Sequence, residues 1–296
     1  MKRKIRVGSR DSKLAVMQTE LVMEAIRRAD PEIELELITL KTTGDMILDK
    51  TLDKIGGKGL FVKELDQALM DGRIDLAVHS LKDMPMEINE ELPIVACAKR
   101  GDPRDVLVLP KGAKPGSYYL VKVGSSTPRR QLQLQILYPI IHLESVRGNI
   151  MTRLKKLDDG EYSALVLAAA GLQRVGLQER IYKYFSTDEI IPAAGQGILA
   201  VQARKDLDVA FLEQVNDPTT ALAATAERSF VRTLDGGCSS PIAAHAVIQD
   251  SELRLKGLYY REETQDYSIG ETSGPAERAE KLGEELALRL KEELGG

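Results

Sequence analysis

The sequence predicts an α/β protein of three parts: two consecutive α/β units and a small α+β unit at the C-terminal end. The 296 residues are enough for two or three domains. From residue 5 to residue 80, apolar strand patterns alternate with amphipathic helix patterns, which is typical of a largely parallel sheet. The same alternation starts again after residue 100. The last third reads as a helix, a hairpin and a final helix.

The first unit is expected to open with a buried strand over 5–9, a helix over 13–29 and a half-exposed strand over 33–40. The apolar residues that recur at helical spacing in the first helix are Leu14, Met17, Leu21 and Ala25. A second helix should end near Gly72, before a buried strand over 74–80. This succession of strands and helices predicts parallel strands joined by helical crossovers.

Residues 42–59 form an unusually long connection between a strand and a helix of this first unit. Connections of this length inside a compact domain are often lids or binding loops. A surface insertion without function is the alternative.

The second unit begins after a turn-rich segment over 100–110 that enters a new strand. The further strands expected in it are 121–126, 140–146 and 163–170. One helix should begin with Thr127 as its N-cap and Pro128 in its first turn, and another should occupy 147–160. The tripeptide Val-Gly-Ser closes a strand at 7–9 and again at 123–125. This echo indicates that the second unit repeats the plan of the first.

The chain then crosses back through residues 192–204, whose final strand we expect to return to the first unit. The last unit should contain a helix over 221–237, a hairpin that turns at Gln249-Asp250-Ser251, and a helix that starts at Pro275. One face of that last helix carries Ala279, Leu282, Leu286 and Leu290. The predicted domains are 1–99 with 195–217 returning, 100–194, and 218–296.

Composition narrows the class of protein. The net charge of −4 argues against a general nucleic-acid binder. Only 4% of the residues are aromatic and tryptophan is absent, which argues against an RNA or sugar binder that stacks on aromatic side chains. Two cysteines cannot form a disulfide framework, so a reducing cytoplasm is expected. The basic start has no apolar segment behind it, and no apolar run approaches the roughly 20 residues that span a bilayer. We therefore expect a cytoplasmic protein without a membrane span.

Arginines gather at the predicted carboxyl ends of strands and at the starts of helices, where α/β sheets bind ligands. They are Arg10, Arg129, Arg130, Arg147, Arg153 and Arg174. Any one of them taken alone could be a solvated surface charge. Together they predict an anion site, because guanidinium groups suit carboxylates or phosphates. The chain has neither a Walker-type nor a Rossmann glycine motif, so nucleotide phosphate is not the favoured anion.

A second candidate lies in the sequence HSLKDMP over 79–85, at the end of a predicted strand. There Asp83 could donate and accept protons or stabilise a cation, and Lys82 would help to keep it ionised. A plain surface ion pair is the alternative.

The cysteines and histidines allow few sites. Cys238 lies in a Gly-Gly-Cys turn as an exposed thiol, either reactive or without a role, whereas Cys97 lies in an apolar run and should be buried. A Cys-His hydrolase would need a histidine beside Cys238, and His245, seven residues on, should face the opposite way on a strand. His79 and His142 are expected to be structural, and no zinc pattern is present, so no metal is predicted.

Ten stretches in series resemble the porphobilinogen deaminases, also called hydroxymethylbilane synthases, of tetrapyrrole (haem) biosynthesis. They are VGSRDSKLA, KTTGD, GGKGLFVKELD, DLAVHSLKDMP, RGDPRDVLV, GSSTPRRQ, VRGNIMTRL, AAAGLQR, PAAGQGILAVQ and GGCSSPIAAHA. The resemblance implies two α/β domains like those of periplasmic binding proteins, and a third domain that carries the cysteine. It also implies a cytoplasmic monomer, a transferase that joins four porphobilinogen molecules with loss of ammonia into hydroxymethylbilane.

By the same resemblance, Cys238 holds a dipyrromethane cofactor through a thioether, and Asp83 is the catalytic residue. The other implied cofactor-binding residues are Lys82, Ser126, Arg129, Arg130, Arg147 and Gly148. The implied substrate-binding residues are Arg10, Ser12, Lys58, Phe61, Thr127, Arg153, Arg174 and Gln196. This chain has Ser239-Ser240 after the cysteine, where many members have Gln and an apolar residue.

Two other functions compete with this prediction. A non-catalytic anion-binding module would explain the paired α/β units and the arginines, but it gives no role to Asp83 or Cys238. A cysteine-dependent acyl transferase or hydrolase would use the thiol but lacks an evident histidine partner.

Overall fold

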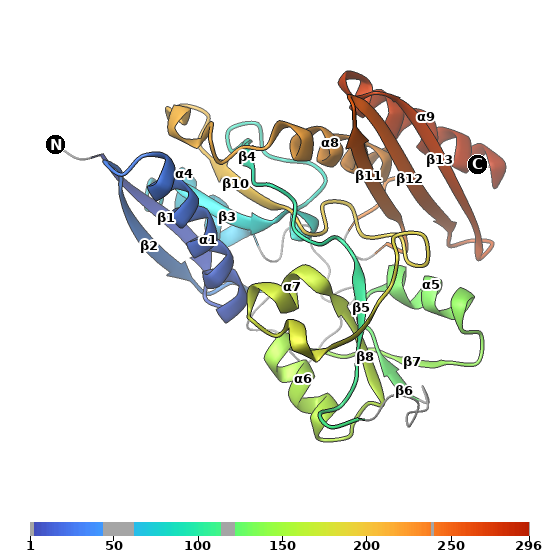
Figure 1. Ribbon diagram of the computed structural model, residues 1–296. Helices are drawn as coiled ribbons and strands as arrows, with labels where there is room; N and C mark the ends of the chain where they lie inside the picture. Colours follow the sequence, from blue (N-terminus) through green and yellow to red (C-terminus); the bar gives the residue numbers. More distant parts are fainter. Residues whose placement is uncertain (1–2, 44–61, 114–121, 238–239, 296) are drawn as a thin grey trace.

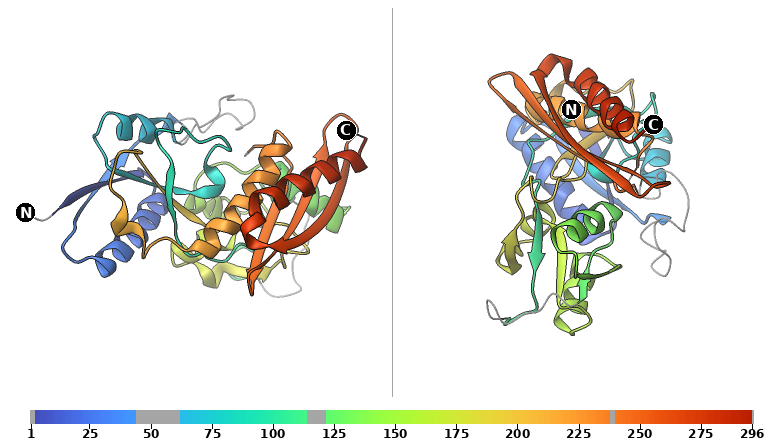
Figure 2. Two further views of the ribbon diagram at one scale, coloured as in Figure 1. Left: turned by 90° about the horizontal axis from the view of Figure 1, so that it is seen from above. Right: turned by 90° about the vertical axis from the view of Figure 1, so that its right-hand side faces the viewer.

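The computed structural model describes residues 3–43, 62–113, 122–237 and 240–295 (Figure 1). Three of the predicted site residues, Lys58, Phe61 and Cys238, lie outside these ranges, as does most of the connection over 42–59. Within the described ranges, the chain forms three separate sheets, two of five strands and one of three. They remain distinct in the two further views of Figure 2. The mixed α/β class predicted from the sequence is confirmed.

The first sheet has the order β2-β1-β3-β10-β4. Its strands are β1 (Lys4–Arg10), β2 (Glu34–Leu40), β3 (Leu76–Ser80), β4 (Ile94–Cys97) and β10 (Leu199–Ala203). Strands β1, β2 and β3 are parallel, as predicted, but β10 runs antiparallel to both of its neighbours. Strand β10, which follows the predicted crossing, therefore does join the first sheet, and it runs antiparallel to the strands beside it.

Two helices accompany the parallel strands, α1 (Lys13–Ala29) and α4 (Lys63–Met70). Both were predicted, and the chain turns at Gly72, whose φ of +66° suits glycine. The apolar spacing noted in the sequence does not mark the buried stripe of α1, because Leu21 is 44% exposed while Val22, Met23 and Ile26 are buried. The stripe that meets the sheet is thus rotated from the expected one, and it includes the polar residues Gln18 and Thr19.

The second sheet repeats the plan of the first, with the order β7-β6-β8-β5-β9. Its strands are β5 (Asp105–Val108), β6 (Lys122–Gly124), β7 (His142–Glu144), β8 (Ala164–Ala168) and β9 (Ile181–Tyr184). Its helices are α5 (Pro128–Leu137), α6 (Ile150–Asp158) and α7 (Ala169–Arg174). Strand β6 is parallel to β7 and β8, as β1 is to β2 and β3. The fourth strand, β5, is again antiparallel to its neighbours and follows a crossing between the units.

The Val-Gly-Ser echo has a structural reason. A Cβ on Gly8 would lie 2.3 Å from Ile74 Cδ1, and one on Gly124 would lie 2.5 Å from Leu165 Cδ2. The serines that follow, Ser9 and Ser125, are fully buried. Strands β1 and β6 therefore both need glycine at the point where a buried side chain crosses them.

The third sheet is antiparallel, with β11 (Ala243–Gln249), β12 (Glu252–Arg261) and β13 (Asp266–Pro275) in that order. The predicted hairpin turn is confirmed, since Asp250 and Ser251 both have positive φ. Strand β13 was not predicted, because it is an edge strand whose polar, glycine-containing sequence lacks an apolar run. The sheet's helices are α8 (Pro218–Thr233) and α9 (Ala279–Glu293).

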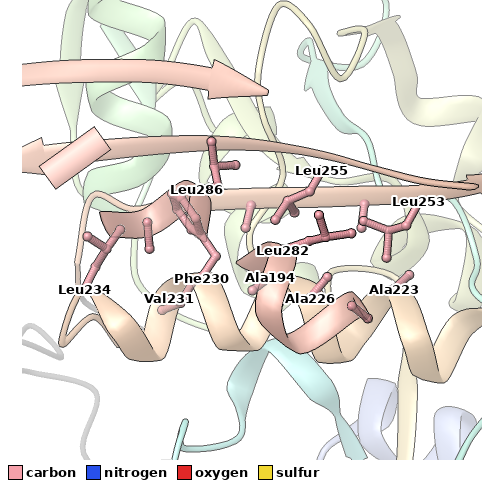
Figure 3. Close-up of a cluster of buried hydrophobic side chains, with 14 of the residues drawn as sticks. Ala194, Ala223, Ala226, Phe230, Val231, Leu234, Leu253, Leu255, Leu282 and Leu286 are labelled. Carbon is pink, nitrogen blue, oxygen red and sulfur yellow. The ribbon is translucent and has the colours of Figure 1, made fainter. Parts of the chain in front are cut away.

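Side chains from α8, α9 and β12 meet in the core of this last unit (Figure 3). Phe230, Leu282 and Leu286 are all nearly inaccessible to solvent there. The face predicted for the last helix, with Ala279 and Leu290, is buried as expected. The other side of α8 packs through Ala221 and Ala224 against the first unit, near Cys97. Helix α8 thus belongs to two cores at once.

Short 3-10 turns complete the described structure at Leu81–Asp83, Gln178–Arg180, Ala210–Leu212 and Ala276–Arg278. Cys97 is buried as predicted, and burial raises the pKa of its thiol to about 11. No helix in the described part of the chain is both long and apolar enough to cross a membrane. The domain boundaries proposed from the sequence stay a prediction.

The buried carboxylate of Glu227, on α8, joins the last unit to the crossing segments. It accepts hydrogen bonds from the backbone N–H groups of Gly195 and Ala246, each at 2.7 Å. The Arg100 guanidinium donates to it at 2.6 Å, and His245 Nδ1 lies 3.5 Å away. Burial alone would raise the pKa of Glu227, but the charge of Arg100 and the contact with His245 outweigh it and lower the pKa to about 2.

We expect Glu227→Gln to destabilise the protein in a pH-dependent way. The folded pKa of about 2 lies below the ordinary glutamate value of 4.5, so the carboxylate's contribution is full above about pH 4.5 and is lost as the pH falls toward 2. This depression corresponds to about 3 kcal/mol of unfolding free energy near neutral pH. Chemical denaturation between pH 7 and pH 3 should show the gap between wild type and variant shrinking in acid. Glu280→Gln, which breaks an exposed ion pair with Arg232, is the control.

If the gap between wild type and Glu227→Gln were the same at pH 7 and at pH 3, the ionised carboxylate would not be what holds these segments together.

Candidate active site

The carboxyl end of the first sheet carries Asp83. Strand β3 ends at Ser80 and passes directly into the 3-10 turn that contains Lys82 and Asp83. The parallel neighbour β1 ends at Arg10, and Ser12 caps α1 by accepting a hydrogen bond from Ala15 N–H at 3.3 Å. A pocket opens at this edge, lined by Arg10, Ala15, Gln18, Val62, Val78, His79, Ser80 and Asp83. The predicted acid/base residue and a predicted anion-binding arginine therefore line one pocket.

The carboxyl end of the second sheet carries the paired arginines. Thr127 caps α5, as predicted, by accepting a hydrogen bond from Arg130 N–H at 3.3 Å. The Ser126 hydroxyl donates to the Val146 carbonyl, which ties the start of α5 to the loop after β7. Two predicted hydroxyl residues therefore shape the edge on which Arg129 and Arg130 stand.

Arg129 and Arg130 are buried together around Asp105, the first residue of β5. Arg129 Nη2 lies 2.7 Å and Arg130 Nε 2.9 Å from its two carboxylate oxygens. Burial would raise the pKa of Asp105, but the charges of the two guanidinium groups outweigh it and hold that pKa well below its usual range. One carboxylate thus balances two buried cations, and the pair keeps an excess positive charge.

Gln196 connects the two edges. Its Nε2 donates to Asp105 Oδ1 at 2.9 Å, and its Oε1 accepts from Lys82 Nζ at 3.2 Å. Burial lowers the pKa of Lys82 to about 8, and the nearby charge of Asp83 opposes this. Because Gln196 lies on the returning crossing segment and Lys82 on the first unit, this residue fixes the basic groups of both units relative to one another.

Arg147, Gly148 and Arg153 form the next part of the same surface. Arg153 Nε donates to the Gly148 carbonyl at 2.7 Å. Gly148 has a φ of +109°, and a Cβ there would lie 2.8 Å from Thr152 Cβ, so the turn needs glycine. Burial lowers the pKa of Arg153 to about 10, helped by the charges of Arg130 and Arg147 and opposed by that of Asp83. Arg153 therefore interacts electrostatically with charged groups at the edges of both five-stranded sheets.

Arg174 ends α7 and reaches the crossing point of the two units. Its Nη2 donates to the Gly197 carbonyl at 2.6 Å, and burial lowers its pKa to about 10. Gly197 has a φ of +89° and approaches Gly101 closely. Arg174 is thus a half-buried cation that the backbone carbonyl of Gly197 holds.

Five of the predicted basic residues therefore lie in one strongly basic region. Electrostatic coupling links Lys82, Arg129, Arg130, Arg147 and Arg153 with only two carboxylates, those of Asp83 and Asp105. Burial is the main cause of the depressed pKa values of Lys82 and Arg153, and repulsion from neighbouring arginines adds to it. Such a region is suited to a ligand with several carboxylates. Among the described residues, no group of His, Cys, Asp and Glu is arranged to hold a metal.

Two sequence models of one family match the chain. The model described as "Porphobilinogen deaminase, dipyromethane cofactor binding domain" matches residues 5–211, and "Porphobilinogen deaminase, C-terminal domain" matches 221–292. The porphobilinogen deaminase of Acetivibrio thermocellus is 56% identical over 97% of this chain and 98% of its own. That of Chromobacterium violaceum is 45% identical over 97% of this chain and 94% of its own. The chain belongs to the porphobilinogen deaminase family.

Membership of the porphobilinogen deaminase family makes the chain a transferase of tetrapyrrole biosynthesis. The two competing predictions, a non-catalytic binding module and a cysteine-dependent hydrolase, are therefore wrong. The methionine-binding protein MetQ superposes with a TM-score of 0.44 at 12% identity, covering 76% of this chain and 91% of its own. The fold class rests on the sheets described above.

The described residues fit the cofactor that the family model names. A dipyrromethane of this family carries carboxylate side chains, and the basic region around Arg129, Arg130 and Arg153 has more cations than its own carboxylates neutralise. Further residues near this region would help to hold the dipyrromethane: Lys82, Ser126, Arg147 and Gly148. Of the unusual serine pair, Ser240 lies within the described residues, and its Oγ accepts from Gly237 N–H at 3.0 Å.

The sequence prediction missed several residues of this region. Asp105 is the one charged residue of the apolar strand sequence DVLV, where it comes first. Nothing in the sequence indicates that it pairs with two arginines. Gln18 lies on a helix face that the apolar spacing did not mark, and its Oε1 accepts from the Ser80 hydroxyl at 3.1 Å. His79 was expected to be structural, and it lines the pocket.

Proposed function

We propose that this chain condenses four porphobilinogen molecules head to tail, with loss of ammonia, into hydroxymethylbilane. The growing product is built on a dipyrromethane joined through a thioether to Cys238. The observation that carries the proposal is the position of Asp83: its carboxylate lines a pocket with Arg10 and is coupled electrostatically to Lys82 and Arg153. One carboxylate surrounded by cations can act on a positively charged reacting group while the cations hold carboxylates of the substrate.

Each cycle breaks one C–N bond and forms one C–C bond. Ammonia leaves the aminomethyl group of porphobilinogen, and positive charge develops on the pyrrole ring, where the Asp83 carboxylate accepts a hydrogen bond from the pyrrole N–H. The dipyrromethane, when bound, supplies the free pyrrole carbon to which the first new ring is joined. After the bond forms, Asp83 takes the proton that this carbon loses. This proton balances the one carried away with ammonia. After four cycles the C–C bond between the dipyrromethane and the first added ring would break, with a proton returned to the dipyrromethane carbon and the hydroxyl of water added to the freed methylene carbon.

The basic residues position the rings. Each porphobilinogen brings an acetate and a propionate, so the negative charge grows with every cycle. Arg10, Arg153 and Arg174 would bind substrate carboxylates, with Ser12, Thr127 and Gln196 as neutral partners and Lys58 and Phe61 added from the family resemblance. Holding each ring in one orientation lowers the entropic part of the barrier.

We also propose that the enzyme acts in the cytoplasm as a monomer, on a small-molecule substrate and without a nucleic-acid or membrane partner. The net charge of −4 supports this, because nucleic-acid and anionic membrane surfaces attract basic proteins.

Intact mass under denaturing, reducing conditions tests the proposed attachment. Wild type and Cys97→Ser should both carry the added mass of two linked pyrrole rings, and Cys238→Ser should carry none. Cys97 is the matched control because it is the other cysteine of the chain and is buried. A bare wild-type mass that does not rise when porphobilinogen is added would rule out the proposal.

A further inference from the structure

His79 stands beside Asp83 and has no role in the reaction described above. It is the second-last residue of β3 and lines the pocket together with Arg10, Gln18 and Asp83. Strands β1 and β3 are parallel, with Gly8 opposite Ala77. Two residues further along, Arg10 and His79 therefore end neighbouring strands side by side.

The His79 imidazole is neutral. The side chain is 6% exposed, and burial lowers its pKa to about 4, with the charge of Arg10 acting in the same direction and Gln202 opposing it. A neutral imidazole has one nitrogen that donates and one that accepts. At this position it can offer a donor without placing another cation beside Arg10.

A nitrogen of this ring is buried without a protein partner. Nε2 makes no hydrogen bond to any residue in the described ranges of the chain. Buried polar atoms are nearly always paired, and an unpaired one in a ligand pocket calls for an explanation. Gln202 supports the ring on one side, and a ligand group that enters the pocket can pair with the side that Gln202 leaves open.

The ring is supported from β10. Gln202 lies opposite Ala77 in the antiparallel pair β3 and β10, so it shares the sheet face of Ala77 and His79. Its Nε2 donates to the Leu92 carbonyl at 2.8 Å, which fixes the amide. The imidazole is therefore held by an element that packs independently of the pocket contents, as a positioning group requires.

We infer that His79 is a further substrate-positioning residue, whose ring N–H donates a hydrogen bond to the porphobilinogen carboxylate that Arg10 binds. This inference rests on the proposed function. A carboxylate is the substrate group that matches the position, because it accepts from a guanidinium and a neutral donor together. Asp83, an acceptor, remains available for the pyrrole N–H.

Steady-state kinetics of His79→Leu and His79→Asn test the inference. Leucine removes the donor and keeps the bulk, so KM for porphobilinogen should rise about 10-fold with a smaller change in kcat, as for the loss of a hydrogen bond to a charged group. Asparagine keeps an N–H and should restore much of the KM. His142→Leu, at an exposed histidine on β7, should behave as wild type. Unchanged KM in His79→Leu, or a loss confined to kcat, would overturn the inference.

Nitrogen-15 NMR of the wild-type holoenzyme gives an answer even if His79→Leu fails to fold. The chain has only three histidines, so their ring signals can be assigned with single variants. The probe is a pyrrole with the acetate and propionate of porphobilinogen and a methyl group in place of the aminomethyl group. Its binding should move the His79 N–H signal and leave the His142 signals in place. Saturation by the probe with no change at His79 would reject the contact.

These outcomes separate the two proposals. A wild-type enzyme that makes hydroxymethylbilane while His79→Leu keeps its KM leaves the proposed function intact and removes only the role of His79. A wild-type enzyme that forms no product removes both.

Discussion

Replacing Asp83 with Asn should lower kcat by about 10²- to 10⁴-fold, the range that a positioned acid/base group contributes. The amide keeps the size of the side chain but can neither stabilise positive charge on the pyrrole ring nor take up the proton after the new bond forms. The loss should appear in kcat more than in KM, since the carboxylate acts on charge that develops during the reaction. The rate of hydroxymethylbilane formation, followed with ammonia release, measures this effect.

Asp71→Asn is the matched control for this experiment. Asp71 is an exposed residue beyond the end of α4, where it accepts a hydrogen bond from Gln67 at 2.6 Å. Both variants should unfold at nearly the wild-type temperature, because Asp83 sits at the rim of a pocket rather than in a core. An Asp83→Asn enzyme with near-wild-type turnover would remove Asp83 from the mechanism.

The fold was predictable where local chemistry decides the structure. Thr127 before Pro128, the Asp250-Ser251 turn and the apolar face of the last helix each fix an element within a few residues, and the structure confirms all three. Strand β13 was not predictable in this way, because an edge strand with one open face needs no apolar pattern. The apolar spacing of α1 also did not reveal its buried stripe, because burial there depends on which residues the sheet meets.

The candidate site was predictable as a set of residue types and not as a set of contacts. Strand ends and helix starts indicated where Arg10, Lys82 and Asp83 would gather. The partners of the basic residues could not be predicted, since Gln196 meets Lys82 and Asp105 across separations of 114 and 91 residues. Contacts of this kind depend on how the two units cross, which no local pattern records.

Asp105 shows what such a contact contributes, and Asp105→Asn should lower the unfolding free energy by about 3–5 kcal/mol. The substitution keeps the shape of the side chain but leaves two buried guanidinium groups, those of Arg129 and Arg130, without their counter-charge. Gln196 would also lose a carboxylate partner, so Lys82 should be held less firmly. Chemical denaturation of the purified enzyme measures the first effect, and KM for porphobilinogen the second.

Asp158→Asn is the matched control, because Asp158 pairs with one arginine, Arg180, in a less buried setting. That pair should contribute about 1 kcal/mol or less. Burial, and not the number of ion pairs, is what makes Asp105 important. Water cannot reach Arg129 and Arg130 to solvate them when the Asp105 charge is lost, whereas it can solvate Arg180 when the Asp158 charge is lost. Equal losses of stability in the two variants would mean that Arg129 and Arg130 are compensated by other groups, and that Asp105 does not organise the basic side of the site.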